Sequence, residues 1–166
     1  GDMMDGSLKE SDIPNPRSPY AVSKIAAEYY VRTIGSLWNI ETTSLRIFNA
    51  YGPGQHLPPS HPPVIPHYIY VDDVVDAMVA AATAPNLNGQ VINVGSGVET
   101  SIKELVNTVL NVTNSKANVI YNNQTSGGVS RMKADLAVAK EKLRFTPSIQ
   151  LEEGLKLTLQ RDTRFK

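Results

Sequence analysis

The chain has 166 residues, enough for one domain with its own hydrophobic core, and 41% of them are apolar. Its 16 basic and 16 acidic residues balance, so the charge pattern gives no sign of a surface for nucleic acid or for an anionic membrane. The absence of cysteine excludes disulfides and thiolate metal sites and fits a reducing compartment. Because there is no apolar run of membrane-spanning length and no signal-peptide pattern at the start, we expect a soluble, cytoplasmic protein.

The first strong element is a helix, predicted from Pro19 to about Ser36. It follows residues 1–17, a segment rich in Asp, Ser, Pro and Gly that indicates a surface loop. Ser18 is a favourable N-cap, and Pro19 is a favourable first helical residue. Apolar residues cover more than one stripe of this helix. This pattern favours burial on two sides, and a partner subunit could supply the second side.

After this helix the sequence alternates between strand and helix patterns. A β-branched, apolar strand is predicted over 42–48, and turn residues over 49–54 end it. Ser101 is followed three residues later by Glu104, which is the pattern of a helix capping box. The other predicted elements are strands over 68–71, 90–94 and 118–121 and helices over 74–83, 101–112, 135–143 and 151–159. This alternation favours an α/β fold.

Tyr20 and Lys24 lie one helical turn apart, so their side chains project from the same face. A free tyrosine titrates near pH 10, and a fixed cation nearby favours the phenolate, so the pair could act as an acid–base group. With 7 Tyr in the chain, about 0.4 Tyr-x-x-x-Lys matches arise by chance. The spacing alone therefore leaves open an alternative, a buried tyrosine and a solvated lysine on an amphipathic helix.

Other candidate features are weaker. His56, His61 and His67 lie in or beside a proline-rich segment, which rarely fixes the converging ligands of a metal site, so we expect no metal. Gly95-x-Gly97 follows a predicted strand but lacks the third glycine of a phosphate loop, which favours a structural turn. Trp38 is expected to pack in the core or at an interface.

Five blocks, present together and in order, resemble the extended short-chain dehydrogenase/reductase family, and within it the nucleotide-sugar epimerases and dehydratases. The blocks are PRSPYAVSK over 16–24, LRIFNAYGPGQ over 45–55, YVDDVVDA over 70–77, NVGSG over 93–97, and GVSR over 128–131 with AD over 134–135 and LEEGL over 151–155. Their joint occurrence is far more specific than the Tyr-Lys spacing.

The resemblance implies a role for four residues. Tyr20 would be the acid–base group that removes a proton from a sugar hydroxyl, beside a tightly held NAD. Lys24 would hydrogen-bond the cofactor's nicotinamide ribose and favour the Tyr20 phenolate, so both residues would also bind the cofactor. Asn49 would contact the substrate, and Arg131 would pair with the nucleotide diphosphate. The family also implies a homodimer through the helix over 19–36.

The sequence also departs from the family pattern. It contains no Gly-x-x-Gly-x-x-Gly turn for the cofactor pyrophosphate, and no Ser or Thr at the family's distance before Tyr20. We therefore expect a truncated, partial Rossmann-like doubly wound α/β fold without its N-terminal strands, plus a small mixed α/β substrate-binding part. The expected division is a Rossmann-type remnant over 1–51 and a substrate-binding part over 52–166 that returns one or more Rossmann elements.

The functional expectation is part of an NAD-dependent nucleotide-sugar epimerase or 4,6-dehydratase acting on a UDP- or dTDP-sugar. Activity of the chain alone is expected to be impaired because the glycine-rich turn is missing. The alternative is a remnant that binds nucleotide-sugars or dimerises without catalysis. Dehydration chemistry needs an added acidic pair, which in the family precedes the tyrosine.

Overall fold

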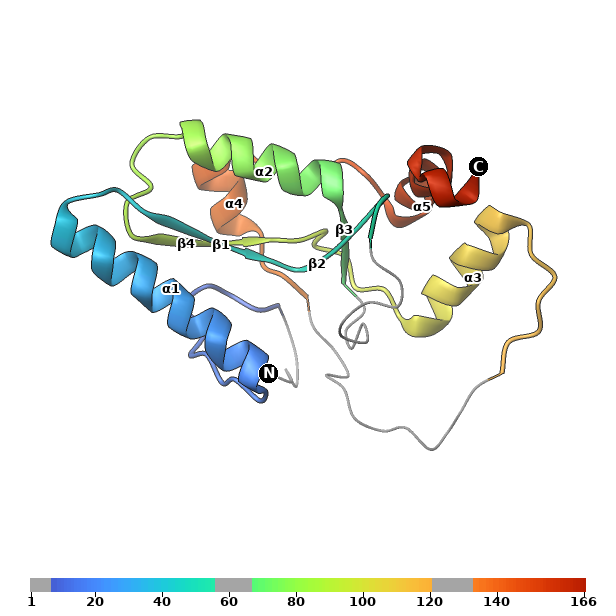
Figure 1. The fold of residues 1–166 in the computed structure, drawn as a ribbon, viewed down its shortest axis with the longest axis horizontal. Coiled ribbons are helices and arrows are strands. Elements are labelled where there is room, and N and C mark those ends of the chain that lie inside the picture. The colour runs from blue at the N-terminus through green and yellow to red at the C-terminus, as the bar shows by residue number, and fades with distance from the viewer. Residues whose placement is uncertain (1–6, 56–66, 121–132) are drawn as a thin grey trace.

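The computed structural model describes residues 7–55, 67–120 and 133–166 (Figure 1). In this part of the chain, strand β1 (Thr43–Ile47) pairs in parallel with β4 (Gln90–Val94), and β2 (Asn49–Tyr51) pairs in parallel with β3 (Tyr68–Tyr70). A single residue, Phe48, separates β1 from β2, and its N–H still donates to the Val94 carbonyl at 2.9 Å. The parallel strands and their helices confirm the predicted α/β class.

Helix α1 (Pro19–Trp38) forms where the sequence predicts it and continues two residues further. The Ser18 hydroxyl accepts a hydrogen bond from the Ala21 N–H at 3.1 Å, which satisfies one of the free donors of the first turn. At the other end the chain turns sharply into β1. A Cβ on Gly35 would lie 2.5 Å from Cγ2 of Thr42, so only glycine allows this close approach.

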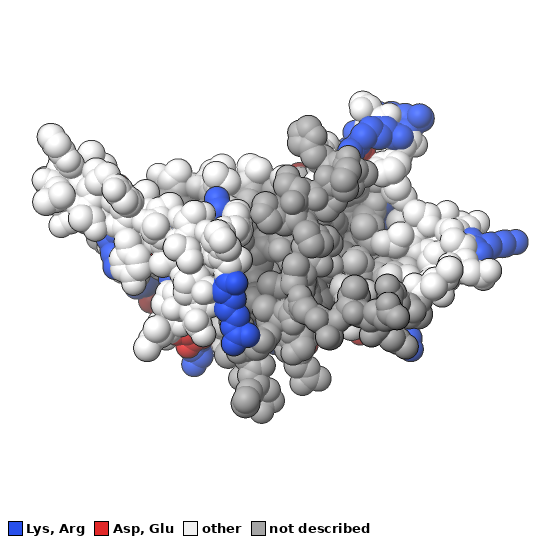
Figure 2. Space-filling view, turned by 60° about the horizontal axis from the view of Figure 1, so that its bottom comes forward, with Lys and Arg blue, Asp and Glu red and all other residues white. Residues whose placement is uncertain are grey.

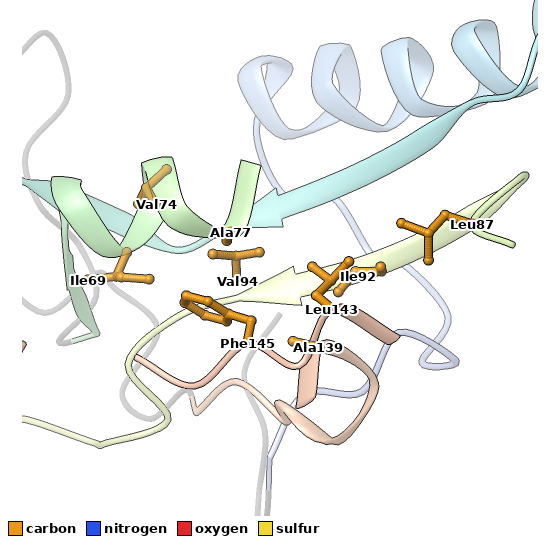
Figure 3. Close-up of a cluster of buried hydrophobic side chains, with 9 residues drawn as sticks. All are labelled: Ile69, Val74, Ala77, Leu87, Ile92, Val94, Ala139, Leu143 and Phe145. Atoms are coloured by element: carbon orange, nitrogen blue, oxygen red, sulfur yellow. The ribbon is translucent and has the colours of Figure 1, made fainter. Parts of the chain in front are cut away.

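The hydrophobic core lies on one side of the β1–β4 pair. Helices α2 (Val71–Thr83) and α4 (Ala137–Leu143) cover this side, whereas α1 lies on the opposite side (Figure 1). The core residues are Ile69, Val74, Ala77, Leu87, Ile92, Val94, Ala139, Leu143 and Phe145 (Figure 3). In α1 only Gly35 is buried, so the burial on two sides expected for this helix is not found within the chain.

Helices α3 (Ile102–Thr113) and α5 (Leu151–Arg161) and a 3-10 turn (Thr163–Phe165) complete the described elements. The predicted capping box opens α3: Glu104 N–H donates to the Ser101 hydroxyl, and Ser101 N–H donates to the Glu104 carboxylate at 2.6 Å. The hydrogen bond from the Ser101 N–H to the carboxylate is the main cause that lowers the pKa of Glu104. Helix α4 begins two residues after Asp135, whose carboxylate accepts from the Ala137 N–H at 2.9 Å.

Three predicted boundaries were wrong. Asn49 to Tyr51 form a strand rather than a turn, because β3 offers a pairing edge and the Tyr51 and Tyr70 rings pack at 5.5 Å. Helix α2 begins at Val71 rather than Val74, which places Asp72 and Asp73 inside its first turn. Residues 118–120 form no strand, and residue 121 lies outside the described residues.

Candidate active site

Tyr20 and Lys24 come together at the start of α1. The Lys24 ammonium nitrogen lies 5.3 Å from the centroid of the Tyr20 ring, over its face. A cation in this position is attracted by the electron density of the ring. The Tyr20 side chain is 55% exposed, so a ligand can reach it. The helix therefore presents the predicted pair to solvent as one unit.

Ideal helix and strand dimensions place Asn49 at a level along the sheet similar to that of this pair. Going backwards along α1 from Gly35 to Glu28, the contacts move forward along the chain from Thr42, just before β1, to Arg46 in β1, so the helix and the strand are antiparallel. Tyr20 lies eight residues before Glu28, about 12 Å further along the helix. Asn49 lies three residues after Arg46, about 10 Å further along the strand. Both therefore extend beyond the carboxyl end of β1 to a similar level.

Arg46 and Glu28 join α1 to β1 through a two-point contact. Arg46 Nε donates to Glu28 Oε2 at 2.8 Å, and Arg46 Nη2 donates to Glu28 Oε1 at 2.9 Å. The two side chains are only 29% and 14% exposed. The hydrogen bond to Glu28 is the main cause that raises the pKa of Arg46. Such a bidentate ion pair is stronger and more directional than an ion pair with a single hydrogen bond.

A short crossing segment, residues 7–12, lies over the carboxyl half of these strands. The Glu10 carbonyl accepts from Arg46 Nη1 at 3.4 Å, and the Glu10 carboxylate accepts from the Asn93 N–H of β4 at 2.8 Å. The side-chain amide of Asn93 (Nδ2) donates to the Leu8 carbonyl at 3.0 Å. This segment, which precedes α1 in the sequence, is thus tied to both strands.

The same segment reaches the chain that follows Arg131. Leu8 forms a parallel bridge with Ala134: its N–H donates to the Lys133 carbonyl at 2.6 Å, and its carbonyl accepts from the Asp135 N–H at 2.8 Å. Arg131 itself lies outside the described residues. Only its chain neighbours from Lys133 onward can be placed, and they lie beside the crossing segment.

Sequence reasoning missed Glu10, Glu28 and Arg46. Two signals for the contact between α1 and β1 were present in the sequence. Glu28 continues the four-residue spacing of Tyr20 and Lys24, and Arg46 interrupts an otherwise apolar strand. A charged residue in such a strand needs a partner, but the sequence does not say which one.

His67 comes directly before β3 and is 2% exposed. Its Nδ1 lies 3.1 Å from the Val98 carbonyl, and its ring meets the edge of Phe48 at 6.4 Å. Burial lowers its pKa, so it is neutral at pH 7. His56 and His61 lie outside the described residues. Among the residues that are described, no group of three His, Asp or Glu is placed to hold a metal ion.

A polar hollow of about 380 Å³ lies at the other end of α1. Its lining includes Arg32, Gly35, Asn39 and Glu41. Gly35 is fifteen residues from Tyr20, which corresponds to about 22 Å along a helix. This hollow is therefore separate from the Tyr20–Lys24 pair.

Within the described ranges, no helix has the length and apolar character needed to cross a membrane.

A Tyr-x-x-x-Lys helix beside parallel strands of a Rossmann-like sheet is the arrangement of an extended short-chain dehydrogenase/reductase. Residues 2–69 match the model of the NAD dependent epimerase/dehydratase family. The chain belongs to this family, which confirms the resemblance inferred from its sequence blocks.

Several of the similar proteins are nucleotide-sugar epimerases. The UDP-glucose 4-epimerase of Mycolicibacterium smegmatis is 31% identical over 172 residues, which cover 90% of this chain and 54% of that protein. The structure of the Thermotoga maritima UDP-glucose 4-epimerase with UDP-glucose has a TM-score of 0.86 and 30% identity, covering 96% of this chain and 58% of that one. For the UDP-N-acetylglucosamine 4-epimerase of Methanobrevibacter ruminantium M1 with UDP-N-acetylmuramic acid, the TM-score is 0.84 and the identity 27%, with coverage of 96% and 58%. The chain spans about half the length of the curated relatives it matches.

Proposed function

We propose that this chain carries the acid–base pair of an NAD-dependent nucleotide-sugar epimerase or 4,6-dehydratase that acts in the cytoplasm on a UDP- or dTDP-sugar. The observation that carries the proposal is the Lys24 ammonium over the face of the exposed Tyr20 ring. Residues 1–51 would belong to the cofactor-binding domain. Residues 52–166 would form the substrate-binding part, except that β4 returns to pair with β1.

Tyr20 would accept the proton of a sugar hydroxyl and later return it. Lys24 would stabilise the negative charge that Tyr20 carries during the proton transfer, since its ammonium lies 5.3 Å from the Tyr20 ring centroid. Asn49 would hold the sugar, since an amide offers both a donor and an acceptor to hydroxyl groups. Arg131, outside the described residues, would bind the diphosphate through its several N–H donors.

The described residues fit one end of the cofactor. An exposed phenol and an ammonium one turn apart offer a donor and an acceptor to the hydroxyls of a nicotinamide ribose. When bound, NAD supplies the hydride acceptor and donor of the reaction. The described residues include no glycine-rich turn for the pyrophosphate, so we expect the 166 residues alone to hold NAD weakly and to be impaired.

We also propose a homodimer through α1. Much of this helix is apolar and exposed, including Tyr30 at 70%, Ile34 at 45% and Trp38 at 74%. Uncharged residues dominate the part of the molecular face in Figure 2 that the structure describes. A monomer rarely leaves so many large apolar side chains in water on one element, and a second copy of α1 would cover them.

The test uses the protein produced from its complete gene. We expect NAD to be retained through purification and either UDP-glucose or dTDP-glucose to be turned over. A change of configuration in the product, detected by NMR, identifies an epimerase, and a 4-keto-6-deoxy product identifies a 4,6-dehydratase. Binding of UDP or dTDP by calorimetry with no NAD and no turnover would instead support the non-catalytic alternative.

A further inference from the structure

Lys24 lies between two groups that can each attract its ammonium. Tyr20, Lys24 and Glu28 follow one another at four-residue steps in α1, so they form one stripe along the helix. Lysine and glutamate at this spacing readily form an ion pair. Such a pair would draw the ammonium away from Tyr20 and would neutralise the charge that favours the phenolate.

The structure shows a different arrangement. Both carboxylate oxygens of Glu28 accept hydrogen bonds from Arg46, at 2.8 and 2.9 Å. In the described part of the chain, no ion pair is recorded between Glu28 and Lys24. The Lys24 nitrogen instead lies 5.3 Å from the Tyr20 ring centroid.

We infer that Arg46 is a positioning residue: by binding both oxygens of Glu28, it keeps this carboxylate away from Lys24 and leaves the ammonium to Tyr20. This inference rests on the proposed function of the Tyr20–Lys24 pair. A planar guanidinium suits the task because it engages both oxygens at once, whereas an ammonium provides a single point of charge.

Arg46 is itself held in place. It lies in β1 opposite Asn93 of β4, and its Nη1 donates to the Glu10 carbonyl at 3.4 Å. The charged or titratable groups that act on it are Glu28, Glu10 and Tyr29, and all three raise its pKa. The guanidinium therefore stays charged, so a change of pH does not release Glu28 by neutralising Arg46.

Three variants of the protein from its complete gene test the inference through steady-state kinetics. In Arg46→Met, Glu28 is released, and we expect kcat to fall about tenfold, part of the usual contribution of an acid–base group. KM should change by less than about twofold, because substrate contacts remain. Glu28→Gln should remain within about twofold of the wild-type kcat, because Arg46 then has no carboxylate to restrain.

The decisive variant is the double one, Glu28→Gln with Arg46→Met. Removing the competing carboxylate should restore kcat to within about threefold of the wild type. If the Arg46–Glu28 contact acted only as a structural link between α1 and β1, the double variant would be as slow as Arg46→Met, and this result would overturn the inference. Lys156→Met, which removes the cation of an exposed ion pair, serves as the control and should leave kcat unchanged.

A second readout does not depend on activity. In a crystal structure of Arg46→Met, we expect the Glu28 carboxylate within about 4 Å of the Lys24 ammonium. If Glu28 turns elsewhere, the inference is wrong. If the wild type turns over no nucleotide-sugar, the proposed function fails, while this structure still decides the role of Arg46. Should Arg46→Met not fold, Arg46→Lys serves, because a single ammonium leaves one Glu28 oxygen available to Lys24.

Discussion

Asp73 holds Ser148 through two hydrogen bonds, although 75 residues separate them in the sequence: the Ser148 N–H and hydroxyl donate to Oδ1 at 3.0 and 2.9 Å. The second carboxylate oxygen accepts from the Ile149 N–H at 3.1 Å. Asp73 is 2% exposed, so these donors replace the water that a carboxylate normally binds. The contact fixes the chain between α4 and α5 to the first turn of α2.

Asp73→Ala should therefore be strongly destabilising. It leaves three donors without their acceptor, and we expect a loss of about 3 kcal/mol or more in the free energy of unfolding, measured by urea denaturation. Asp72→Ala is the matched control on the same turn. Asp72 is 42% exposed and pairs with Arg161 at the surface, so its loss should cost less than about 1 kcal/mol. Equal effects of the two variants would show that the Asp73 contact contributes little.

Much of the fold could be predicted from local sequence. The Ser18 and Ser101 caps and the β4 strand are where residue type and spacing place them, because capping and strand patterns depend on near neighbours. The β2 strand could not be predicted in this way. Its three residues look like a turn, and only the edge of β3, far along the chain, makes them extended.

The candidate site divides in the same way. Tyr20 and Lys24 belong to one helix, so their proximity follows from helical spacing. The partners of Glu28 and Asp73 lie on other elements and could be found only in the folded structure. The two-sided apolar pattern of α1 predicted burial on both sides, but in this structure only Gly35 of the helix is fully buried.

Tyr20→Phe removes only the phenol oxygen and should leave the fold unchanged. Because a positioned acid–base group contributes roughly 10² to 10⁴ in rate, we expect kcat for the nucleotide-sugar to fall by that range. Tyr30→Phe, on the same helix and 70% exposed, is the control and should keep kcat within about twofold. A Tyr20→Phe protein with wild-type kcat would remove Tyr20 from the proposed chemistry.

The proposed dimer predicts the effect of charge on α1. Tyr30 and Ile34 lie one turn apart, so Tyr30→Glu combined with Ile34→Lys adds two charges to the exposed stripe while forming a favourable helical pair. Sedimentation velocity should then show monomers at concentrations where the wild type is dimeric. Val79→Lys, on α2 and 59% exposed, should not change the wild-type association. A double variant that still dimerises like the wild type would place the interface elsewhere.

His67 makes stability depend on pH in a defined direction. Burial is the main cause that lowers its pKa below 6.5. The hydrogen bond to the Val98 carbonyl and the negative charge of Glu99 raise the pKa, whereas the positive charge of Lys133 lowers it further. Above pH 6.5 the imidazole is neutral in both folded and unfolded states, so it adds no pH dependence. Below 6.5 the unfolded chain binds a proton that the folded chain resists, and the folded state loses stability as pH falls.

His67→Gln keeps a hydrogen-bond donor for Val98 but does not titrate. Its free energy of unfolding, measured by urea denaturation, should therefore fall less than that of the wild type between pH 7 and pH 5, with a difference in slope of no more than about 1.4 kcal/mol per pH unit. The other titratable groups remain in both proteins, so the comparison isolates His67. Parallel pH profiles for the two proteins would mean that the buried imidazole accepts a proton as readily in the folded state as in the unfolded one.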